Sequence, residues 1–130
     1  MNIWAGEFGD AYTVRNPATP EKIRQREALW GQIINAMLPA QPREIIEFGA
    51  NVGMNIAALR SLLPSASFVA IEPNDCARAQ LVDSDSQFVT SPGRVWSSDH
   101  PEADPRDLAF TCGVLIHIHP DELLAFCQNV

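Results

Sequence analysis

The strongest constraint on the fold is the alternation of short apolar runs with segments of helical periodicity from residue 44 onward. The runs have the length and the β-branched or aromatic content of buried strands. Such alternation is typical of βαβ units, so the sequence predicts an α/β fold with a mostly parallel sheet flanked by helices. The predicted strands are 44–48, 67–72, 87–90 and 107–113, and the predicted helices are 53–63, 74–81 and a last one from about 120.

The residues before this alternation contain one further predicted helix. Thr19 suits an N-cap, Pro20 suits the first helical position and Glu21 places an acid in the first turn. An apolar stripe follows at helical spacing until Pro39. Residues 1–19 carry aromatic residues and glycines without periodicity, so we expect an ordered loop there.

Length and charge exclude several classes of function. A chain of 130 residues forms at most one domain. Its net charge is -7 and Lys22 is the only lysine, so no basic surface is available to bind nucleic acid. No apolar run approaches the roughly 20 residues that cross a bilayer, and the first residues do not resemble a signal peptide. We therefore expect neither nucleic acid nor a membrane as a partner.

The cysteines Cys76, Cys112 and Cys127 have no CxxC spacing. Their odd number, in a chain without an export signal, indicates reduced thiols and a cytoplasmic protein. We expect all three to be packing residues.

A glycine-containing turn, Glu47 to Gly53 in the sequence EFGANVG, follows the first predicted strand. Ligands of parallel α/β sheets bind at the carboxyl ends of the strands, where such a turn leads into a helix. Gly49 and Gly53 permit positive φ and the close approach of a ligand. The turn matches the pattern [DE]xGxGxG at three of four positions and departs from it at Asn51, a residue type that tolerates the left-handed conformation.

A second acid, Glu72, ends the second predicted strand 25 residues after Glu47. A carboxylate in this position accepts hydrogen bonds from the ribose hydroxyls of an adenosine. A dinucleotide also needs its pyrophosphate seated on a helix N-terminus by a stricter glycine pattern, which is absent here. Because S-adenosylmethionine has no phosphate, the two acids and the looser turn favour that cofactor.

Three segments resemble motifs of class I, Rossmann-like S-adenosylmethionine-dependent methyltransferases. They are residues 47–53, Ile71-Glu72-Pro73 and DLAFTCGVLIHIHPDEL at 107–123. WAGEFGDAYTVRN at 4–16, with GVLIHIHPDEL, is similar to the pseudaminic acid biosynthesis-associated methylases. The resemblance implies a single partial cofactor-binding domain over 1–130, with 1–19 as a lid loop and without the C-terminal strands of that fold.

The resemblance also implies roles for individual residues. Glu47 and Gly49 would lie near the methionine part of the cofactor and Glu72 near its ribose. The adenine contact would fall within 91–95, where the match is weak. The other residues implied to line or close the cofactor site are Asn51, Gly53, Pro73, Thr111, Cys112, Gly113 and Leu115 to His117. Tyr12 and Arg15 are implied to fold over the cofactor, and Arg15 is able to pair with a carboxylate.

The histidines allow more than one interpretation. His117 matches the histidine of the family and is our candidate general base, because histidine exchanges protons near neutral pH. A structural histidine beneath the cofactor is an equal alternative. His117 and His119, with Asp121 two residues on, have a spacing that a metal site can use, but the third ligand would have to come from the start of a helix, so we expect no metal. We expect His119 to cap the last helix at the surface.

The predicted function is methyl transfer to an oxygen or nitrogen of a small acceptor, for which the resemblance suggests a sugar or nucleotide-sugar. One alternative is a truncated, inactive module that binds the cofactor or a protein partner. A second alternative is an NAD-dependent oxidoreductase, which the residues Asn51 and Met54 in the glycine positions disfavour. The fourth strand is expected at an open edge of the sheet, which suggests a homodimer.

Overall fold

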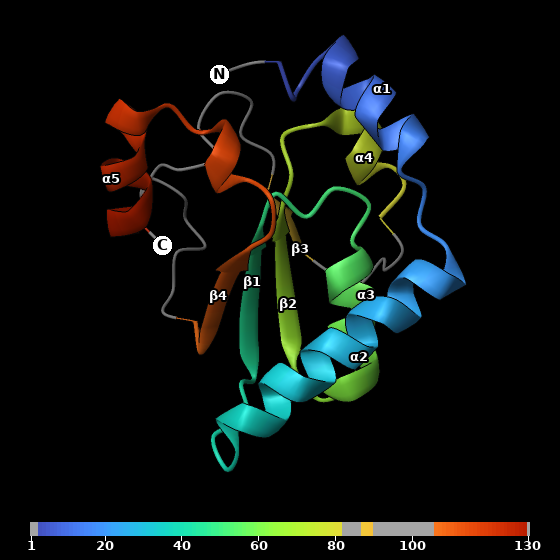
Figure 1. Cartoon of the computed structure of the whole chain (residues 1–130), viewed down its shortest axis with the longest axis vertical. Helices are drawn as coiled ribbons and strands as arrows, with labels where there is room; N and C mark the ends of the chain where they lie inside the picture. Colours follow the sequence, from blue (N-terminus) through green and yellow to red (C-terminus); the bar gives the residue numbers. More distant parts are fainter. Residues whose placement is uncertain (1–2, 82–86, 90–105, 130) are drawn as a thin grey trace.

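The structure is a computed structural model that describes residues 3–81, 87–89 and 106–129. Helices and strands alternate along most of the chain (Figure 1). The elements are α1 (Glu7–Arg15), α2 (Pro20–Met37), β1 (Glu44–Phe48), α3 (Met54–Leu62), β2 (Ser67–Ile71), α4 (Asp75–Arg78), β3 (Gln87–Val89), β4 (Leu108–Thr111), a 3-10 turn (Leu115–His117) and α5 (Pro120–Asn129).

The described strands form a parallel sheet in the order β3-β2-β1-β4. The register pairs Phe48 of β1 with both Ile71 of β2 and Thr111 of β4, so three strands end at one level. The Rossmann-like α/β fold predicted from the sequence is therefore confirmed. Its strand β4 lies at an edge of the described sheet, as predicted.

Side-chain alternation along the strands builds two apolar layers. Ile45 and Phe68 point to the face covered by α2 and α3, where they pack with Trp30 and Leu59 among others. Ile46, Phe48, Val69 and Ile71 point to the opposite face and pack with Ile118 and Phe126. Figure 1 shows α2 and α3 on one side of the sheet and α5 on the other. The carboxyl edge of the sheet is left for polar residues.

Two predicted helix caps, Thr19 and Asn74, are confirmed by their hydrogen bonds. Thr19 caps α2, because its hydroxyl oxygen accepts a hydrogen bond from Lys22 N at 3.3 Å. Asn74 caps the short α4 in the same way, since its Oδ1 accepts from Ala77 N at 2.8 Å.

The prediction of a loop over residues 1–19 is wrong for residues 7–15, which form α1. Acids in the first turn and Arg15 in the last turn of this helix complement the helix dipole. Only Gly9 and Thr13 of α1 are buried. A helix that buries such small side chains has no apolar stripe, and apolar periodicity is the signal by which helices are predicted.

The prediction that the cysteines are packing residues is wrong for Cys112 and Cys127, which are exposed. Cys112 directly follows β4, and Cys127 lies in α5 directly after the buried Phe126. All three thiols are free, and Cys76 is half-buried. Among the described residues, no helix is both long enough and apolar enough to cross a membrane.

Candidate functional site

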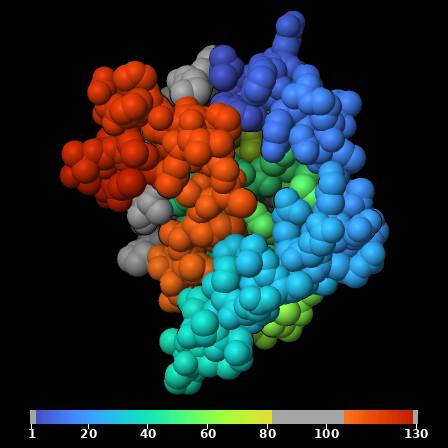
Figure 2. All heavy atoms as spheres, viewed as in Figure 1, coloured from blue at the N-terminus to red at the C-terminus, as the bar shows by residue number. Residues whose placement is uncertain are grey.

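A cavity with a volume of about 470 Å³ lies at the carboxyl edge of the sheet. Its walls come from the turn after β1, the end of β2, the segment after β4, α1 and the first turns of α2. Figure 2 shows a hollow between the blue N-terminal residues and the orange C-terminal residues, with green residues at its base. The predicted site residues in its lining are Tyr12, Glu47, Gly49, Asn51, Glu72, Pro73, Cys112, Gly113 and His117.

Five other predicted site residues lie outside the lining, namely Arg15, Gly53, Thr111, Leu115 and Ile116. Arg15 is exposed in the last turn of α1. Gly53 is the N-cap residue of α3, with φ of 77°. Thr111 ends β4, and its buried Oγ1 has no hydrogen-bond partner among the described residues. The predicted adenine contact at 91–95 lies outside the described residues.

The turn after β1 has the left-handed geometry that its sequence predicts. Gly49 has φ of 79° and Asn51 has φ of 48°. Gly49 N also donates a hydrogen bond to Ile71 O at 2.7 Å, which ties the turn to the end of β2. A Cβ atom at Gly49 would collide with Cγ2 of Val114. The turn after β1 and the segment after β4 therefore meet closely here, because position 49 has no side chain.

Glu47 places a buried carboxyl group at the floor of the cavity. Its side chain is only 1% exposed, and Oε1 accepts a hydrogen bond from Asn55 Nδ2 at 2.7 Å. Oε2 has no partner among the described residues. Burial raises the pKa of Glu47 to about 8, against the opposing effects of the Asn55 hydrogen bond and the positive charge of Arg26. A buried carboxyl oxygen without a partner is suited to a ligand that donates hydrogen bonds.

Glu72 is held by two backbone N–H groups. Its Oε2 accepts from Asn51 N at 2.7 Å and its Oε1 accepts from Asn74 N at 2.8 Å. Burial raises the pKa of Glu72, and these two hydrogen bonds oppose the rise. Each carboxylate oxygen has a second lone pair, so a fixed Glu72 can still accept hydrogen bonds from a ligand.

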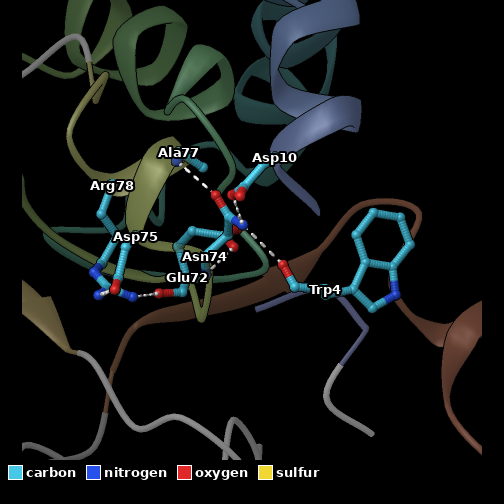
Figure 3. A network of polar contacts seen from close by, with 7 residues as sticks. All are labelled: Trp4, Asp10, Glu72, Asn74, Asp75, Ala77 and Arg78. Carbon is cyan, nitrogen blue, oxygen red and sulfur yellow. Dashed lines mark hydrogen bonds and ion pairs between the residues drawn. The ribbon is translucent and has the colours of Figure 1, made fainter. Parts of the chain in front are cut away.

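Asn74 connects this carboxylate to the N-terminal segment. Figure 3 shows its side chain between Asp10 and the carbonyl of Trp4. Nδ2 donates to Asp10 Oδ1 at 2.8 Å and to Trp4 O at 3.0 Å, while Oδ1 accepts from Ala77 N. The residue is 2% exposed, and both N–H donors of its amide are used. One residue therefore fixes α1 against the end of β2.

Aromatic rings close the other side of the cavity. The Trp4 ring lies 4.7 Å from the His117 ring and 5.3 Å from the Tyr12 ring, between centroids. His117 is exposed and lines the cavity from the 3-10 turn after β4. The predicted surface role of His119 is confirmed, because its Nδ1 accepts a hydrogen bond from Asp121 N at 3.3 Å at the start of α5.

The described residues include no group of three or more His, Cys, Asp or Glu side chains that is placed to hold a metal ion.

Several lining residues were not predicted from the sequence, and Asn55 and Arg26 are the most informative of them. Asn55 is positioned by two helices, because its Oδ1 accepts a hydrogen bond from Trp30 Nε1 at 3.3 Å while its Nδ2 binds Glu47. Arg26 reaches the cavity from α2. A polar residue in the first turn of the helix after Gly53 was the one available signal for Asn55, and Arg26 had none.

Comparison with known proteins identifies the fold. No protein-family model matches the sequence, and neither does any curated protein. Solved structures of plantazolicin methyltransferases do match. BpumL with a monoazolic desmethylPZN analogue and SAH has a TM-score of 0.68 at 16% identity, over 95% of this chain and 49% of the other. BpumL with a pentazolic analogue and SAH has a TM-score of 0.64 at 17% identity, over 94% and 47%.

The related structure of BamL with a triazolic desmethylPZN analogue and SAH has a TM-score of 0.67 at 14% identity, over 97% of this chain and 47% of the other. At such identities the likeness establishes a shared fold. The chain spans about half the length of these structures.

Proposed function

We propose that the chain binds S-adenosylmethionine in the cavity at the carboxyl edge of the sheet and belongs to the class I methyltransferases. The observation that carries the proposal is the meeting of Glu47, Gly49 and Glu72 in one cavity. The shared fold with methyltransferases solved with SAH, the demethylated product of this cofactor, supports it.

The residues present fit the parts of such a cofactor. Glu72 is fixed where the ribose hydroxyls would donate to its remaining lone pairs. Glu47 Oε2, which has no partner in the part of the chain that the structure describes, is suited to the ammonium group of the amino-acid end. Gly49 keeps the floor of the cavity free of a side chain, so that a ligand can lie against the backbone.

When bound, the cofactor supplies a sulfonium whose methyl group is already electrophilic. The protein therefore mainly aligns the acceptor, and alignment of this kind contributes on the order of 7 to 11 kcal/mol to catalysis. His117 lines the cavity and is the proposed base for an acceptor that must lose a proton. Trp4 and Tyr12 form the proposed lid together with the rest of α1.

The proposed acceptor is a small molecule that is methylated on oxygen or nitrogen. The resemblance of residues 4–16 and 113–123 to the pseudaminic acid biosynthesis-associated methylases supports a sugar or nucleotide-sugar. A test is to incubate the chain with S-adenosylmethionine and candidate acceptors and to measure the SAH formed by mass spectrometry. Product that depends on acceptor and is lost in His117→Ala supports the assignment of the base.

NAD-dependent oxidoreduction is the less supported alternative. Dinucleotide sites use the stricter glycine pattern that positions 51 and 54 lack. The solved structures that share this fold, BpumL and BamL, are methyltransferases. A titration of NADH fluorescence distinguishes the two, because an oxidoreductase would enhance it at micromolar protein concentration and a methyltransferase would leave it unchanged. Dimerisation through the β4 edge is a further proposal, for which native mass spectrometry is the measurement.

A further inference from the structure

The two acidic positions of the cavity differ in the charge around them. Glu72 receives two backbone N–H groups, and Arg78, the cation whose charge acts on it, lies outside the lining. Glu47 shares its end of the cavity with Arg26, whose positive charge acts on the Glu47 carboxyl group and which itself lines the cavity. The Glu47 end therefore combines an acid with a guanidinium of the lining, whereas the guanidinium that acts on Glu72 lies outside the lining.

This asymmetry matches a ligand with a zwitterion at one end and neutral hydroxyls at the other. An α-amino acid carries an ammonium and a carboxylate on the same carbon, and each needs an opposite partner. Glu47 Oε2 is unpartnered among the described residues and is suited to the ammonium. A nearby guanidinium is suited to the carboxylate, because its planar N–H fork fits two carboxylate oxygens.

Arg26 has donors to spare for this role. Its side chain is half-buried on α2, and Nη1 donates to Lys22 O at 3.2 Å. A guanidinium carries five N–H donors, so this bond uses one of them. The neighbouring ammonium of Lys22 donates to Pro17 O at 3.1 Å, at the start of α2. Arg15, which sequence analysis assigned to a carboxylate, is exposed and outside the lining.

Resting on the proposed function, we infer that Arg26 binds the α-carboxylate of the cofactor's amino-acid end while Glu47 faces the ammonium. Arg26 is then a specificity-determining residue, which selects ligands that retain the whole amino-acid group. Nucleosides without that group bind through the Glu72 end alone and are unaffected by the charge at position 26.

The test compares two ligands by isothermal titration calorimetry. S-adenosylhomocysteine carries the amino-acid end, and 5′-methylthioadenosine has the same nucleoside without it. In Arg26→Gln we expect S-adenosylhomocysteine to bind roughly 10- to 100-fold more weakly, the usual loss for a hydrogen bond to a charged group. The affinity for 5′-methylthioadenosine is expected to stay within about threefold. Arg24→Gln, at an exposed arginine of the same helix that lies outside the lining, is the matched control and is expected to change neither affinity.

The outcomes separate this inference from the proposed function. If the unmodified chain binds neither ligand, the proposed function fails and the inference with it. If it binds S-adenosylhomocysteine and Arg26→Gln leaves that affinity unchanged, or weakens both ligands equally, only the inference is overturned. Arg26→Gln can also unfold the chain, and circular dichroism would detect this.

A second arm of the experiment then needs no variant. Decarboxylated S-adenosylmethionine keeps the ammonium and lacks the carboxylate. The unmodified chain is expected to bind it roughly 10- to 100-fold more weakly than S-adenosylmethionine. Equal affinities for the two would overturn the role of Arg26.

Discussion

Asn74 Nδ2 donates a hydrogen bond to Asp10 Oδ1 over a distance of 2.8 Å and joins two segments that are 64 residues apart in the sequence. The same amide also donates to the backbone carbonyl of Trp4, and the backbone N–H of Asn74 donates to Glu72. The N-terminal segment and the proposed ribose-binding carboxylate are thus fixed by one side chain and its own backbone (Figure 3).

Replacing Asn74 by aspartate tests this connection. The variant keeps an oxygen that caps α4, but it places a carboxylate against the Asp10 carboxylate and the Trp4 carbonyl. We expect the free energy of unfolding to fall by roughly 1 to 3 kcal/mol, as for other buried groups left unsatisfied. Urea denaturation measures this loss. Adding Asp10→Asn restores a donor between the two positions and should recover at least half of it, whereas no recovery would contradict the pairing.

Gly49→Ala tests the close meeting of β1 with the segment after β4. An alanine there combines positive φ with a collision against Val114, so we expect a loss of stability of roughly 1 to 3 kcal/mol or more. Gly31→Ala in α2 is the matched control, because no atom lies within 4 Å of the added Cβ. It should gain roughly 0.5 to 1 kcal/mol from helix propensity. Equal effects of the two substitutions on the urea midpoint would refute this account of the turn.

Glu72→Ala tests the proposed ribose contact. The variant removes the acceptor for ribose hydroxyls and leaves the N–H groups of Asn51 and Asn74 without their partner. We expect the affinity for S-adenosylhomocysteine in calorimetry to fall roughly 100-fold. Glu21→Ala, at an exposed carboxylate in the first turn of α2, serves as the control. Unchanged binding in Glu72→Ala would show that the ligand lies elsewhere.

Glu47 predicts how stability depends on pH. Its pKa is about 8 when folded and 4.5 as the ordinary value, so between these pH values the folded state holds a proton that the unfolded state has lost. The contribution of Glu47 to stability is complete at low pH and declines by roughly 1.4 kcal/mol per pH unit across this range. In Glu47→Gln this contribution is absent. The free energy of unfolding, measured by urea denaturation, should therefore fall less steeply between about pH 5 and 8 than in the unmodified chain. Parallel pH profiles of the two proteins would contradict the raised pKa.

The same carboxyl group predicts a proton linked to ligand binding. An ammonium beside Glu47 favours its ionised form, so binding of S-adenosylhomocysteine at neutral pH should release a proton. Calorimetry in two buffers with different ionisation enthalpies measures the release. Glu47→Gln should abolish it. Heats that do not depend on the buffer in the unmodified chain would argue against an ammonium at this position.

Local signals in the sequence were sufficient to predict most of the fold. The bounds of β1 are those predicted, and the caps of α2 and α4 are Thr19 and Asn74 as expected. Each of these features depends on a few adjacent residues, such as Thr19 directly before Pro20. The helix α1 was missed because its buried residues are Gly9 and Thr13, which carry no apolar pattern.

The residue pattern was sufficient to predict the site where it follows a strand, whereas Tyr12 of α1 was predicted from the family resemblance. Glu47 and Glu72 are placed by the ends of β1 and β2, and a parallel sheet brings such ends together. Arg26 and Asn55 are placed instead by the packing of α2 against α3, and the contact of Trp4 with His117 joins opposite ends of the chain. Such contacts depend on helix packing in three dimensions, which a residue pattern does not encode.

Native mass spectrometry of the chain with S-adenosylmethionine is the most direct test of the central claim that this cavity is a cofactor site. The account predicts one bound cofactor per chain, and loss of the bound species in Glu72→Ala. A spectrum in which the folded chain carries no cofactor at saturating concentration would contradict it.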